Sequence, residues 1–567
     1  MKQPPSQPAD FWRLVLVEGF VCLMFGLLLW KILSLQVLDT DRGYEFLRSQ
    51  GEKRFLREAI IPTYRGSISD RHGEILAVST PVSSLWANPR LLATSERLPE
   101  LATALGRSPE KLREQLQSYS SKSFMYLQRH MQPSRAREIM QLEIYGVGES
   151  REYQRYYPAA ALAAHLVGFT DLDDRGIAGM ELAYEKYLRG FPGRKQVIKN
   201  ERGVVVREVG ELEAARPGQN LSLSIDLRLQ YVAHQGLQRA IVRSGAESGS
   251  IVTLDVQTGE VLAVVNHPVF NPNNRSRVNP GWTRNRALVD AFEPGSVLKP
   301  LLVAAALEAG QFTPDTVLDT APGSIWVGRK VIEDPVNYGE STVARVLAKS
   351  SQVGIVKIAL QLDPQDVWKM YRKFGLGLPM GTGFPGESAG TLEFREHWRD
   401  IERATMAYGH GLRVTPLQLA VAFAAIANGG WRHQASLTLV NPAEVESERI
   451  MDQALALQLR GMLEGVTAAE GTGRRAQVEG FRVSGKTGTA HKAAAGGYAK
   501  DRYLSLFAGL APASRPRLVT VVMINEPKGG HYHGGVVAAP VFSEVMGAAL
   551  RLLNIAPDQY HTPGAVR

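Results

Sequence analysis

The hydrophobic and polar positions divide the chain into three parts, and the first is a long apolar run. Leu14–Trp30 is apolar except for Glu18, and the apolar character continues past Lys31 to Leu38. As a helix, the 25 positions from 14 to 38 would span about 37 Å, more than the roughly 30 Å of a bilayer's hydrocarbon core. No small-residue cleavage site and no wide polar stripe accompany the run. We therefore predict an uncleaved transmembrane helix over residues 14–38 rather than a signal peptide or a buried helix.

The charges that flank this helix leave its orientation open. Lys2 and Arg13, in the short tail of residues 1–13, favour a cytoplasmic tail. A larger group of basic residues follows the helix, against the rule that positive charge stays inside: Arg42, Arg48, Lys53, Arg54 and Arg57. Long domains can cross a membrane regardless of such charges, so the count excludes neither orientation. Glu18 suits either a contact with a membrane partner or a place near the headgroups.

Residues 39 to about 220 form the second part, in which short extended stretches alternate with charged helical ones. Leu101–Leu116 and Glu181–Leu188 have the pattern of surface helices. Glycine and proline mark frequent turns, and Pro217–Asn220 is a turn-rich boundary. This pattern predicts an α+β domain that ends near residue 220.

From residue 221 to about 559 the chain contains apolar, β-branched runs separated by long helical stretches. Two early runs flank a turn and are typical of a hairpin: Ser250–Val256 and Glu260–Asn266. Three further strand-like runs come much later: Phe481–Ala490, Leu504–Leu510 and Leu518–Asn525. The region between them is mostly helical, for example at Ser296–Ala309, Ser341–Leu362 and Pro416–Asn428. The order predicts one antiparallel sheet with a large helical insertion, an α/β layered domain, followed by a short tail over residues 560–567.

Composition narrows the class of protein without naming a function. Of the 567 residues, 44% are hydrophobic and 21% are charged, which excludes a wholly disordered, collagenous, coiled-coil or polytopic membrane chain. The net charge of +9 fits a mixed solvated surface better than a nucleic-acid binder, and the sequence has no nucleic-acid module, phosphate loop or zinc-helix motif. The single cysteine, Cys22, excludes internal disulfides and cysteine metal clusters, and its apolar neighbours predict an inert packing residue.

The first chemical motif is Ser296, followed by Lys299 three residues later. Proline is tolerated in the first turn of a helix, so Pro300 places a helix start near Ser296. Ser296 would then lie at a helix N-terminus, where N–H groups favour negative charge, with Lys299 on the same face. A desolvated lysine amine can lose its proton and serve as a base for the serine hydroxyl. An N-capping serine explains the motif equally well.

The second motif is Lys486–Thr489, in a strand-like run. In a regular strand Thr487 and Thr489 would face one way and could bind one carboxylate, while Lys486 would face the other way and add positive charge. Gly485 and Gly488 lack side chains that would stop a substrate from lying along the strand. The alternative is an ordinary strand-to-turn sequence.

The third motif is Lys349–Gly354, in the middle of a helical stretch. Ser350 could pass a proton between the lysine and a leaving group, and Gln352 could bind an amide of the substrate. The alternative is a capped break in the helix.

Together the three motifs match the S-x-x-K, S-D-N and K-T-G signature of penicillin-binding proteins and class A β-lactamases. The chain resembles a class B penicillin-binding protein, the monofunctional peptidoglycan D,D-transpeptidase, over nearly its whole length. Arg65–Ala77 is similar to the family's non-catalytic signature near the membrane, and Gly176–Glu181 is similar to another. Arg284–Ala287 before Phe292–Gly295, together with Gly383–Glu387, is similar to the septal, cell-division subtype.

The resemblance implies an architecture and a location. The fold would be an α/β penicillin-binding transpeptidase domain over residues 221–559, with an antiparallel sheet between helical layers. It would stand on an elongated α+β pedestal of the dimerisation type over residues 39–220. The protein would be a single-pass inner-membrane protein with a cytoplasmic tail and a periplasmic enzyme, which settles the orientation. Its membrane partners would include a glycan polymerase of the shape, elongation, division and sporulation family and other divisome proteins.

The resemblance also implies a mechanism that needs no cofactor or metal. Ser296, deprotonated by Lys299, would attack the penultimate carbonyl of a stem peptide ending in D-Ala-D-Ala, and Ser350 would help protonate the leaving D-Ala. The substrate-binding residues would be Gln352, Lys486, Thr487, Gly488 and Thr489, with the N–H groups of Ser296 and Thr489 as the oxyanion hole. An amine of a neighbouring stem would release the acyl group and form the cross-link. β-Lactams would mimic the donor and stay attached.

One departure and two alternatives accompany this interpretation. The family usually has asparagine where this chain has Gln352, whose amide lies one methylene farther out, a displacement of about 1 Å that can cost rate. A β-lactam-hydrolysing enzyme shares the three motifs, and a non-enzymatic divisome scaffold or β-lactam sensor could retain the pocket. His531 and His533 would be a weak metal pair, and the resemblance favours a substrate-facing loop there.

Overall fold

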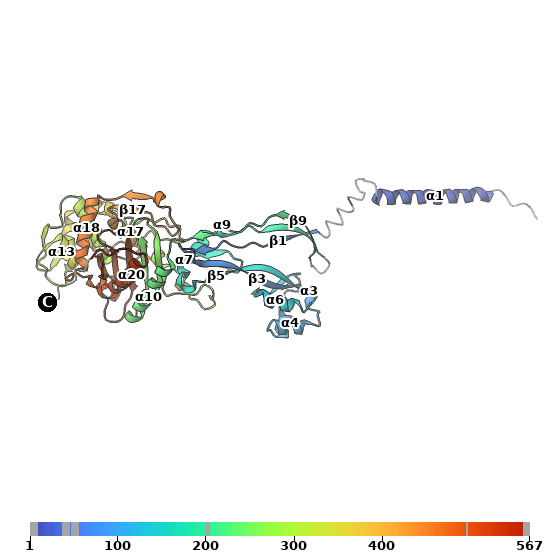
Figure 1. Cartoon of the computed structure of the whole chain (residues 1–567), viewed down its shortest axis with the longest axis horizontal. Coiled ribbons are helices and arrows are strands. Elements are labelled where there is room, and N and C mark those ends of the chain that lie inside the picture. The colour runs from blue at the N-terminus through green and yellow to red at the C-terminus, as the bar shows by residue number, and fades with distance from the viewer. Residues whose placement is uncertain (1–8, 37–45, 47–55, 200–204, 495–496, 560–567) are drawn as a thin grey trace, which may run out of the picture. The chain divides into compact units, whose positions relative to one another are not determined.

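The protein is described from a computed structural model that covers residues 9–36, 46, 56–199, 205–494 and 497–559. Its internal contacts divide the chain into two units (Figure 1). The first unit consists of Met1–Tyr64, Pro81–Tyr153 and Gly190–Pro217, and the second of Arg65–Thr80, Gln154–Arg189 and Gly218–Arg567. The division of function between residues 39–220 and 221–559 stays a prediction.

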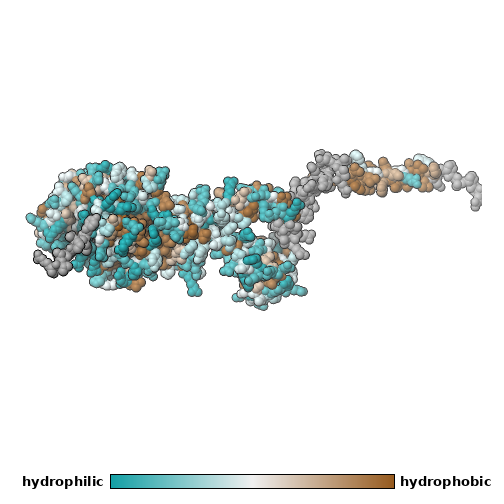
Figure 2. Space-filling model, viewed as in Figure 1, coloured by the Kyte–Doolittle hydropathy of each residue, from teal (hydrophilic) through white to brown (hydrophobic). Residues whose placement is uncertain are grey.

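Helix α1 (Ala9–Gln36) confirms the predicted apolar span near the N-terminus. Its segment Phe11–Leu35 is long and apolar enough to cross a membrane and is exposed along its length, and Figure 2 shows its hydrophobic surface. Such a surface is unfavourable in water and suits a bilayer. Cys22 is free and exposed on this helix, and its predicted packing role stays a prediction. The basic residues predicted to follow the helix, except Arg57, lie outside the described residues.

After helix α1, the described part of the first unit contains two groups of strands and four short helices. Strands β1 (Leu56–Ile61), β8 (Gly193–Lys199) and β9 (Val205–Glu213) form an antiparallel sheet in the order β1-β8-β9. Residues Ser83–Ala87, the end of β3 (Ile75–Ala87), pair with β4 (Met125–Met131). The helices α3 (Pro89–Leu92), α4 (Leu98–Ala104), α5 (Pro109–Ser118) and α6 (Pro133–Met140) share a small hydrophobic core with these strands.

Two helices predicted from the sequence are broken in the structure. The helix predicted over Leu101–Leu116 is divided into α4 and α5. Gly106 between them has a φ of +66°, and the Ser108 side chain caps α5 by accepting a hydrogen bond from the Lys111 N–H. The helix predicted over Glu181–Leu188 is divided at Tyr184 into α8 (Gly179–Ala183) and α9 (Glu185–Leu188).

The second unit contains the predicted antiparallel sheet. Its strands lie in the order β12-β11-β21-β20-β19, and every neighbouring pair is antiparallel. The bounds are β11 (Ser248–Asp255), β12 (Val261–His267), β19 (Ser484–Ala494), β20 (Gly497–Ala511) and β21 (Leu518–Asn525). The strands match the predicted runs, and the helical insertion lies between β12 and β19, as predicted.

The insertion consists of helices and short hairpins. The α-helices are α11 (Arg286–Val289), α12 (Lys299–Glu308), α13 (Val343–Lys349), α14 (Gln352–Gln361), α15 (Pro364–Lys373), α16 (Asp400–Ala407), α17 (Pro416–Ala427) and α18 (Gln453–Thr467). The paired strands are β13 (Val317–Asp319) with β16 (Glu340–Thr342), β14 (Ser324–Val327) with β15 (Lys330–Glu333), and β17 (Trp431–His433) with β18 (Ser447–Arg449).

Helices cover both faces of the five-stranded sheet (Figure 1). On one face, α10 (Leu227–Ser244) and α20 (Ala539–Leu552) share a hydrophobic core with side chains such as Phe507. On the other face, α12 and α17 share a larger core with side chains such as Leu506. Neighbouring residues of one strand enter different cores because side chains alternate across a strand. The predicted α/β fold, with a sheet between helical layers, is confirmed.

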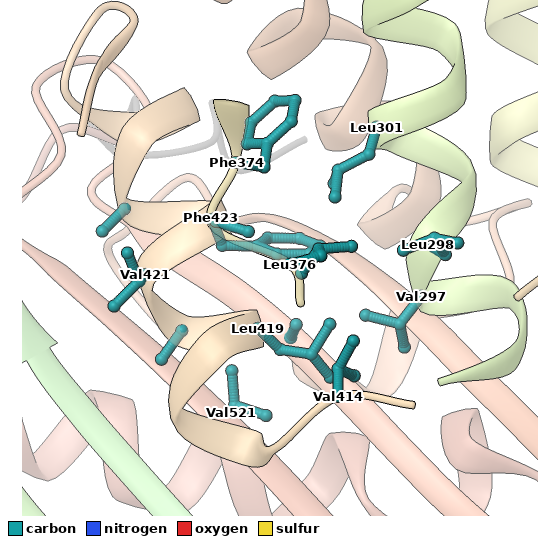
Figure 3. Packing of buried hydrophobic residues seen from close by; sticks show 14 of the residues in the cluster. Val297, Leu298, Leu301, Phe374, Leu376, Val414, Leu419, Val421, Phe423 and Val521 are labelled. Atoms are coloured by element: carbon teal, nitrogen blue, oxygen red, sulfur yellow. The ribbon is translucent and has the colours of Figure 1, made fainter. Parts of the chain in front are cut away.

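The larger core holds the segment that carries Ser296. Figure 3 shows Val297, Leu298 and Leu301 facing α17, which contributes Leu419 and Phe423. All five side chains have no exposed surface. A fully buried side chain of this size contributes roughly 1.5–3 kcal/mol through burial. These contacts therefore fix the backbone that directly follows Ser296.

The two segments similar to family signatures meet inside the second unit. Arg65 Nε lies 2.5 Å from Glu181 Oε2, and Arg155 Nε lies 2.6 Å from Glu181 Oε1. All three side chains are buried. A buried carboxylate needs such paired donors to offset its lost hydration. The segments thus stabilise this unit, and these residues do not line the pocket described next.

Candidate active site

A pocket of about 950 Å³ in the second unit brings the three sequence motifs together. Six of the eight predicted site residues line it: Ser296, Ser350, Gln352, Thr487, Gly488 and Thr489. The other two, Lys299 and Lys486, are fully buried behind its wall. Where the motifs meet, the pocket wall therefore carries hydroxyl and amide groups and is backed by two lysine amines.

Ser296 lies in a short 3-10 turn, η3 (Gly295–Leu298), that leads directly into α12. The prediction of a helix from Ser296 is confirmed, with its first turn wound more tightly. In such a turn, side chains three residues apart are eclipsed, and the Lys299 N–H donates to the Ser296 carbonyl. The half-buried Ser296 and the buried Lys299 therefore start from the same side of the segment.

The prediction of one helix over Ser341–Leu362 is wrong, because the structure breaks this helix at Ser350, a residue of the site. Helix α13 ends at Lys349, and Ser350 adopts the left-handed conformation with φ 58° and ψ 36°. Helix α14 then begins at Gln352, and the Ser351 side chain caps it by accepting a hydrogen bond from the Gly354 N–H, 2.9 Å away. A residue other than glycine in this conformation carries strain, which the surroundings must offset. The capped helix break, which was the alternative interpretation of this motif, therefore occurs at the candidate catalytic serine itself, and the two interpretations do not exclude each other.

Two lysine amines converge on the hydroxyl of Ser350. Lys486 Nζ donates to Ser350 Oγ at 2.9 Å, and Lys299 Nζ lies 3.3 Å from the same oxygen. Lys299 Nζ also donates to the carbonyls of Ser350 at 2.5 Å and Ser351 at 3.1 Å. Ser350 is therefore placed to exchange protons with both amines.

Burial changes the charge state of these amines. Desolvation lowers the pKa of Lys299 to about 7, although the charge of Asp334 opposes the shift. Desolvation, and then the nearby Lys299, lower the pKa of Lys486 well below its ordinary 10.5. An amine that loses its proton near neutral pH can accept one from a hydroxyl. The site therefore contains lysine amines of lowered pKa, which the sequence motif suggested but could not establish.

The two threonines of β19 lie on the pocket side of the strand, and Lys486 lies on the other. Thr487 Oγ1 is 2.9 Å from Thr472 Oγ1, and the Gly534 N–H donates to Thr489 Oγ1 at 3.1 Å. These contacts orient both hydroxyls at the pocket wall. Their role in carboxylate binding stays a prediction.

The glycines of this strand are also needed for packing. A Cβ on Gly488 would lie 2.5 Å from Val297 Cγ2 and 3.1 Å from the Pro294 carbonyl. A Cβ on Gly485 would lie 2.6 Å from the Phe507 ring. Gly488 therefore lets the turn that carries Ser296 pack directly against β19, and the predicted path for a substrate along the strand stays a prediction.

Several pocket residues have no signal in the sequence motifs. Thr472 pairs with Thr487, and the Tyr503 and Tyr532 rings stack with centroids 3.9 Å apart. Glu293 accepts a hydrogen bond from the Tyr498 hydroxyl at 3.1 Å and also contacts His410, whose pKa is lowered by burial. Each of these contacts joins residues far apart in the chain, so no local spacing could have revealed it.

The loop that contains His531 and His533 contributes to the pocket through Tyr532 and His533. This position agrees with the preferred interpretation of a substrate-facing loop. In the described part of the chain, no three histidine, cysteine, aspartate or glutamate side chains are grouped as a metal site would require.

Comparison with known proteins identifies relatives across nearly the whole chain. Residues 249–547 match the model of the penicillin binding protein transpeptidase domain, and residues 60–223 match the penicillin-binding protein dimerisation domain. The chain is 40% identical to peptidoglycan D,D-transpeptidase FtsI of Escherichia coli, over 97% of this chain and 93% of that protein. It is 41% identical to a Pseudomonas aeruginosa protein named "Probable peptidoglycan D,D-transpeptidase PbpC", over 98% of each chain.

Solved structures of penicillin-binding proteins are also similar to this chain. The apo transpeptidase domain of penicillin-binding protein 3 from Burkholderia pseudomallei is 40% identical, with a TM-score of 0.55, and covers 60% of this chain and 98% of that chain. Penicillin-binding protein 3 of Mycobacterium tuberculosis complexed with ampicillin is 29% identical, with a TM-score of 0.69, and covers 89% of this chain and 98% of that chain.

Gly488→Ala should destabilise the protein, because the added methyl group would force β19 away from Val297 and Pro294. We expect a loss of about 1–3 kcal/mol in the free energy of unfolding, typical of overpacking. Gly461→Ala is the matched control, since its Cβ meets nothing within 4 Å and alanine favours the middle of helix α18. Thermal unfolding of the full chain in detergent measures both, and equal midpoints for the two variants would contradict the packing argument.

Proposed function

Because this chain belongs to the class B penicillin-binding proteins and is a serine-type peptidoglycan D,D-transpeptidase, we propose that Ser296 is the residue acylated by the stem peptide. The observation that carries the proposal is the convergence of two buried lysine amines on Ser350 Oγ, in the pocket that Ser296 lines. This arrangement supports the three catalytic roles predicted for Ser296, Lys299 and Ser350.

The acylation step follows from these positions. Neutral Lys299 accepts the proton of Ser296 as its Oγ forms a bond with the penultimate carbonyl carbon of the donor. The N–H groups of Ser296 and Thr489 stabilise the oxyanion, and the hydroxyls of Thr487 and Thr489 bind the terminal carboxylate. The peptide bond then breaks, and Ser350 delivers a proton to the departing D-Ala amine and regains one from Lys486 or Lys299.

The second step transfers the acyl group to an amine of a neighbouring stem peptide. That amine loses its proton to the same lysine and serine groups as it attacks the ester, so Ser296 is regenerated and the cross-link is formed. A β-lactam carries the reactive amide in a ring, so its leaving group stays attached after acylation. The ring-opened product therefore occupies the pocket, and deacylation is slow.

The alternatives from the sequence are less well supported by the site. Hydrolysis of β-lactams would need a base for water, and among the described residues that line the pocket the one carboxylate is Glu333, which is exposed at the end of β15. A scaffold or sensor without catalysis has no need for a dry lysine pair of lowered pKa. Transpeptidation is therefore the function we propose.

We further propose that α1 anchors the protein in the inner membrane, with residues 1–13 in the cytoplasm and the enzyme in the periplasm. Peptidoglycan lies outside that membrane, and the similarity to FtsI supports a septal role. A glycan polymerase in the same membrane would supply new strands for cross-linking, and other divisome proteins would localise the pair. Stem peptides and β-lactams are the small ligands of this proposal.

Ser296→Ala should abolish the covalent adduct with benzylpenicillin, because the variant lacks the attacking oxygen. Intact-mass spectrometry of the full chain should show one added penicillin in the wild type and none in Ser296→Ala. Ser118→Ala, which removes an exposed hydroxyl in α5, is the control and should label fully. Labelling of Ser296→Ala would refute the assignment, and rapid turnover of the wild-type adduct would favour the hydrolase.

The rate of penicillin acylation should fall as the pH drops below about 7, because the pKa of Lys299 is lowered to about 7 and only the neutral amine accepts a proton. Well below that pKa we expect a loss of about tenfold per pH unit. Stopped-flow measurement with a chromogenic cephalosporin gives the profile. Lys299→Arg, which stays charged, should be slow at every pH, and a wild-type profile that is flat from pH 5 to 8 would contradict Lys299 as the base.

Gln352→Asn should change the preference among β-lactams, because the shorter side chain withdraws its amide by about 1 Å. Gln352 lines the pocket while its N–H donates to Asp334, so the substitution alters the amide and not the backbone. We expect acylation rates to change several-fold for penicillins with an acylamide side chain and less for 6-aminopenicillanic acid, which lacks it. The same ratio for every compound would remove the proposed role of Gln352 in binding that group.

A further inference from the structure

Asp334 is an acidic side chain that binds the residues directly after Ser350. Its carboxylate accepts a hydrogen bond from Ser351 Oγ at 2.5 Å and from the Gln352 N–H at 2.5 Å. The Val353 N–H is a longer third donor at 3.4 Å. The carboxylate therefore binds the three residues that directly follow Ser350.

Asp334 is itself held in place from the other side. It directly follows strand β15, and its N–H donates to the Gly323 carbonyl at 2.9 Å. Lys330 to Glu333, the residues of β15, line the pocket. Asp334 thus joins a pocket wall to the turn between α13 and α14.

These contacts account for the strained conformation of Ser350. The Ser351 hydroxyl makes two hydrogen bonds: it donates to Asp334 and accepts from the Gly354 N–H. The carboxylate also offsets the partial positive charge of the α14 N-terminus. With α14 fixed at its first residue, the chain must turn sharply at Ser350, and the carbonyls of Ser350 and Ser351 face Lys299 Nζ.

The charge of Asp334 also acts on the base. The titratable neighbours of Lys299 are the Lys486 amine from β19 and the Asp334 carboxylate from the segment after β15. The turn between α13 and α14 presents only neutral hydroxyl and carbonyl groups to it. Asp334 raises the pKa of Lys299 against the larger effect of burial. Without that charge the amine would be a weaker base.

We propose that Asp334 is a positioning residue for the acylation step: its carboxylate fixes the turn that presents Ser350 and holds the Ser350 and Ser351 carbonyls against Lys299 Nζ. The inference rests on the proposed function, since it concerns the rate of the same acylation. It goes beyond the three motifs, because Asp334 belongs to none of them.

The test compares pH profiles of acylation for wild type, Asp334→Asn and Asp334→Glu, with a chromogenic cephalosporin and the full chain in detergent. Asparagine keeps the size and one acceptor oxygen but removes the charge. We expect its maximal rate to fall roughly tenfold, because a misplaced catalytic group costs rate, and its acidic limb to move to lower pH. Asp315→Asn, which removes an exposed carboxylate of the same unit, is the control and should leave the profile unchanged.

The outcomes separate the possible failures. A lower maximal rate of Asp334→Asn with the acidic limb in place would indicate a purely structural role and would overturn the proposal that Asp334 acts on the groups that transfer the proton. An unchanged maximal rate would overturn the positioning role itself. If Asp334→Asn does not fold, Asp334→Glu decides, since it keeps the charge and should show the wild-type limb with a reduced maximum. Failure of the wild type to acylate would instead refute the proposed function.

Discussion

The site depends on keeping two lysine amines away from water. Lys299 and Lys486 have no exposed surface, and both donate to the Ser350 segment. Burying an ammonium ion costs several kcal/mol unless it is paired, so the protein favours the neutral amine. Neutral amines are the form that a serine nucleophile needs. The chemistry we propose is therefore a direct result of packing, because water that reached these amines would restore their charge.

The packing that excludes water comes from the order of the strands. Strand β19 lies at an edge of the sheet and is paired with β20, and the turn that carries Ser296 packs against its face at Gly488. Gly488 allows that turn to approach, and Val297 fills the space where a side chain would be. The free edge of such a strand can pair with an extended peptide, which fits the donor that we propose. In this proposal one strand serves both for assembling the site and for holding its substrate.

The sequence predicted the parts of this structure that depend on local patterns. The five strands, the apolar helix and the three motifs follow from periodicity, turn residues and short spacings. The break at Ser350 did not, because a left-handed serine is set by contacts with residues such as Asp334, which lies 16 positions earlier in the chain. The break between α4 and α5 had local signals in Gly106, Ser108 and Pro109, which were outweighed by the helical pattern around them. The reason for Gly488 could not be predicted, since it depends on Val297.

Gln352, where the family usually has asparagine, differs from the family in its side chain and not in how its backbone is held. Its N–H is held by Asp334, and Ser351 caps the same helix, so the backbone position does not depend on which amide follows. The groups that we propose as catalytic are held by other contacts: Ser350 by the lysines, and Ser296 by the turn between Gly295 and Leu298. In the function that we propose, a longer amide at residue 352 would therefore alter what the pocket recognises while leaving the proton-transfer groups in place. Selection on substrate or inhibitor preference can act at this position without disturbing the dry lysine pair on which acylation depends.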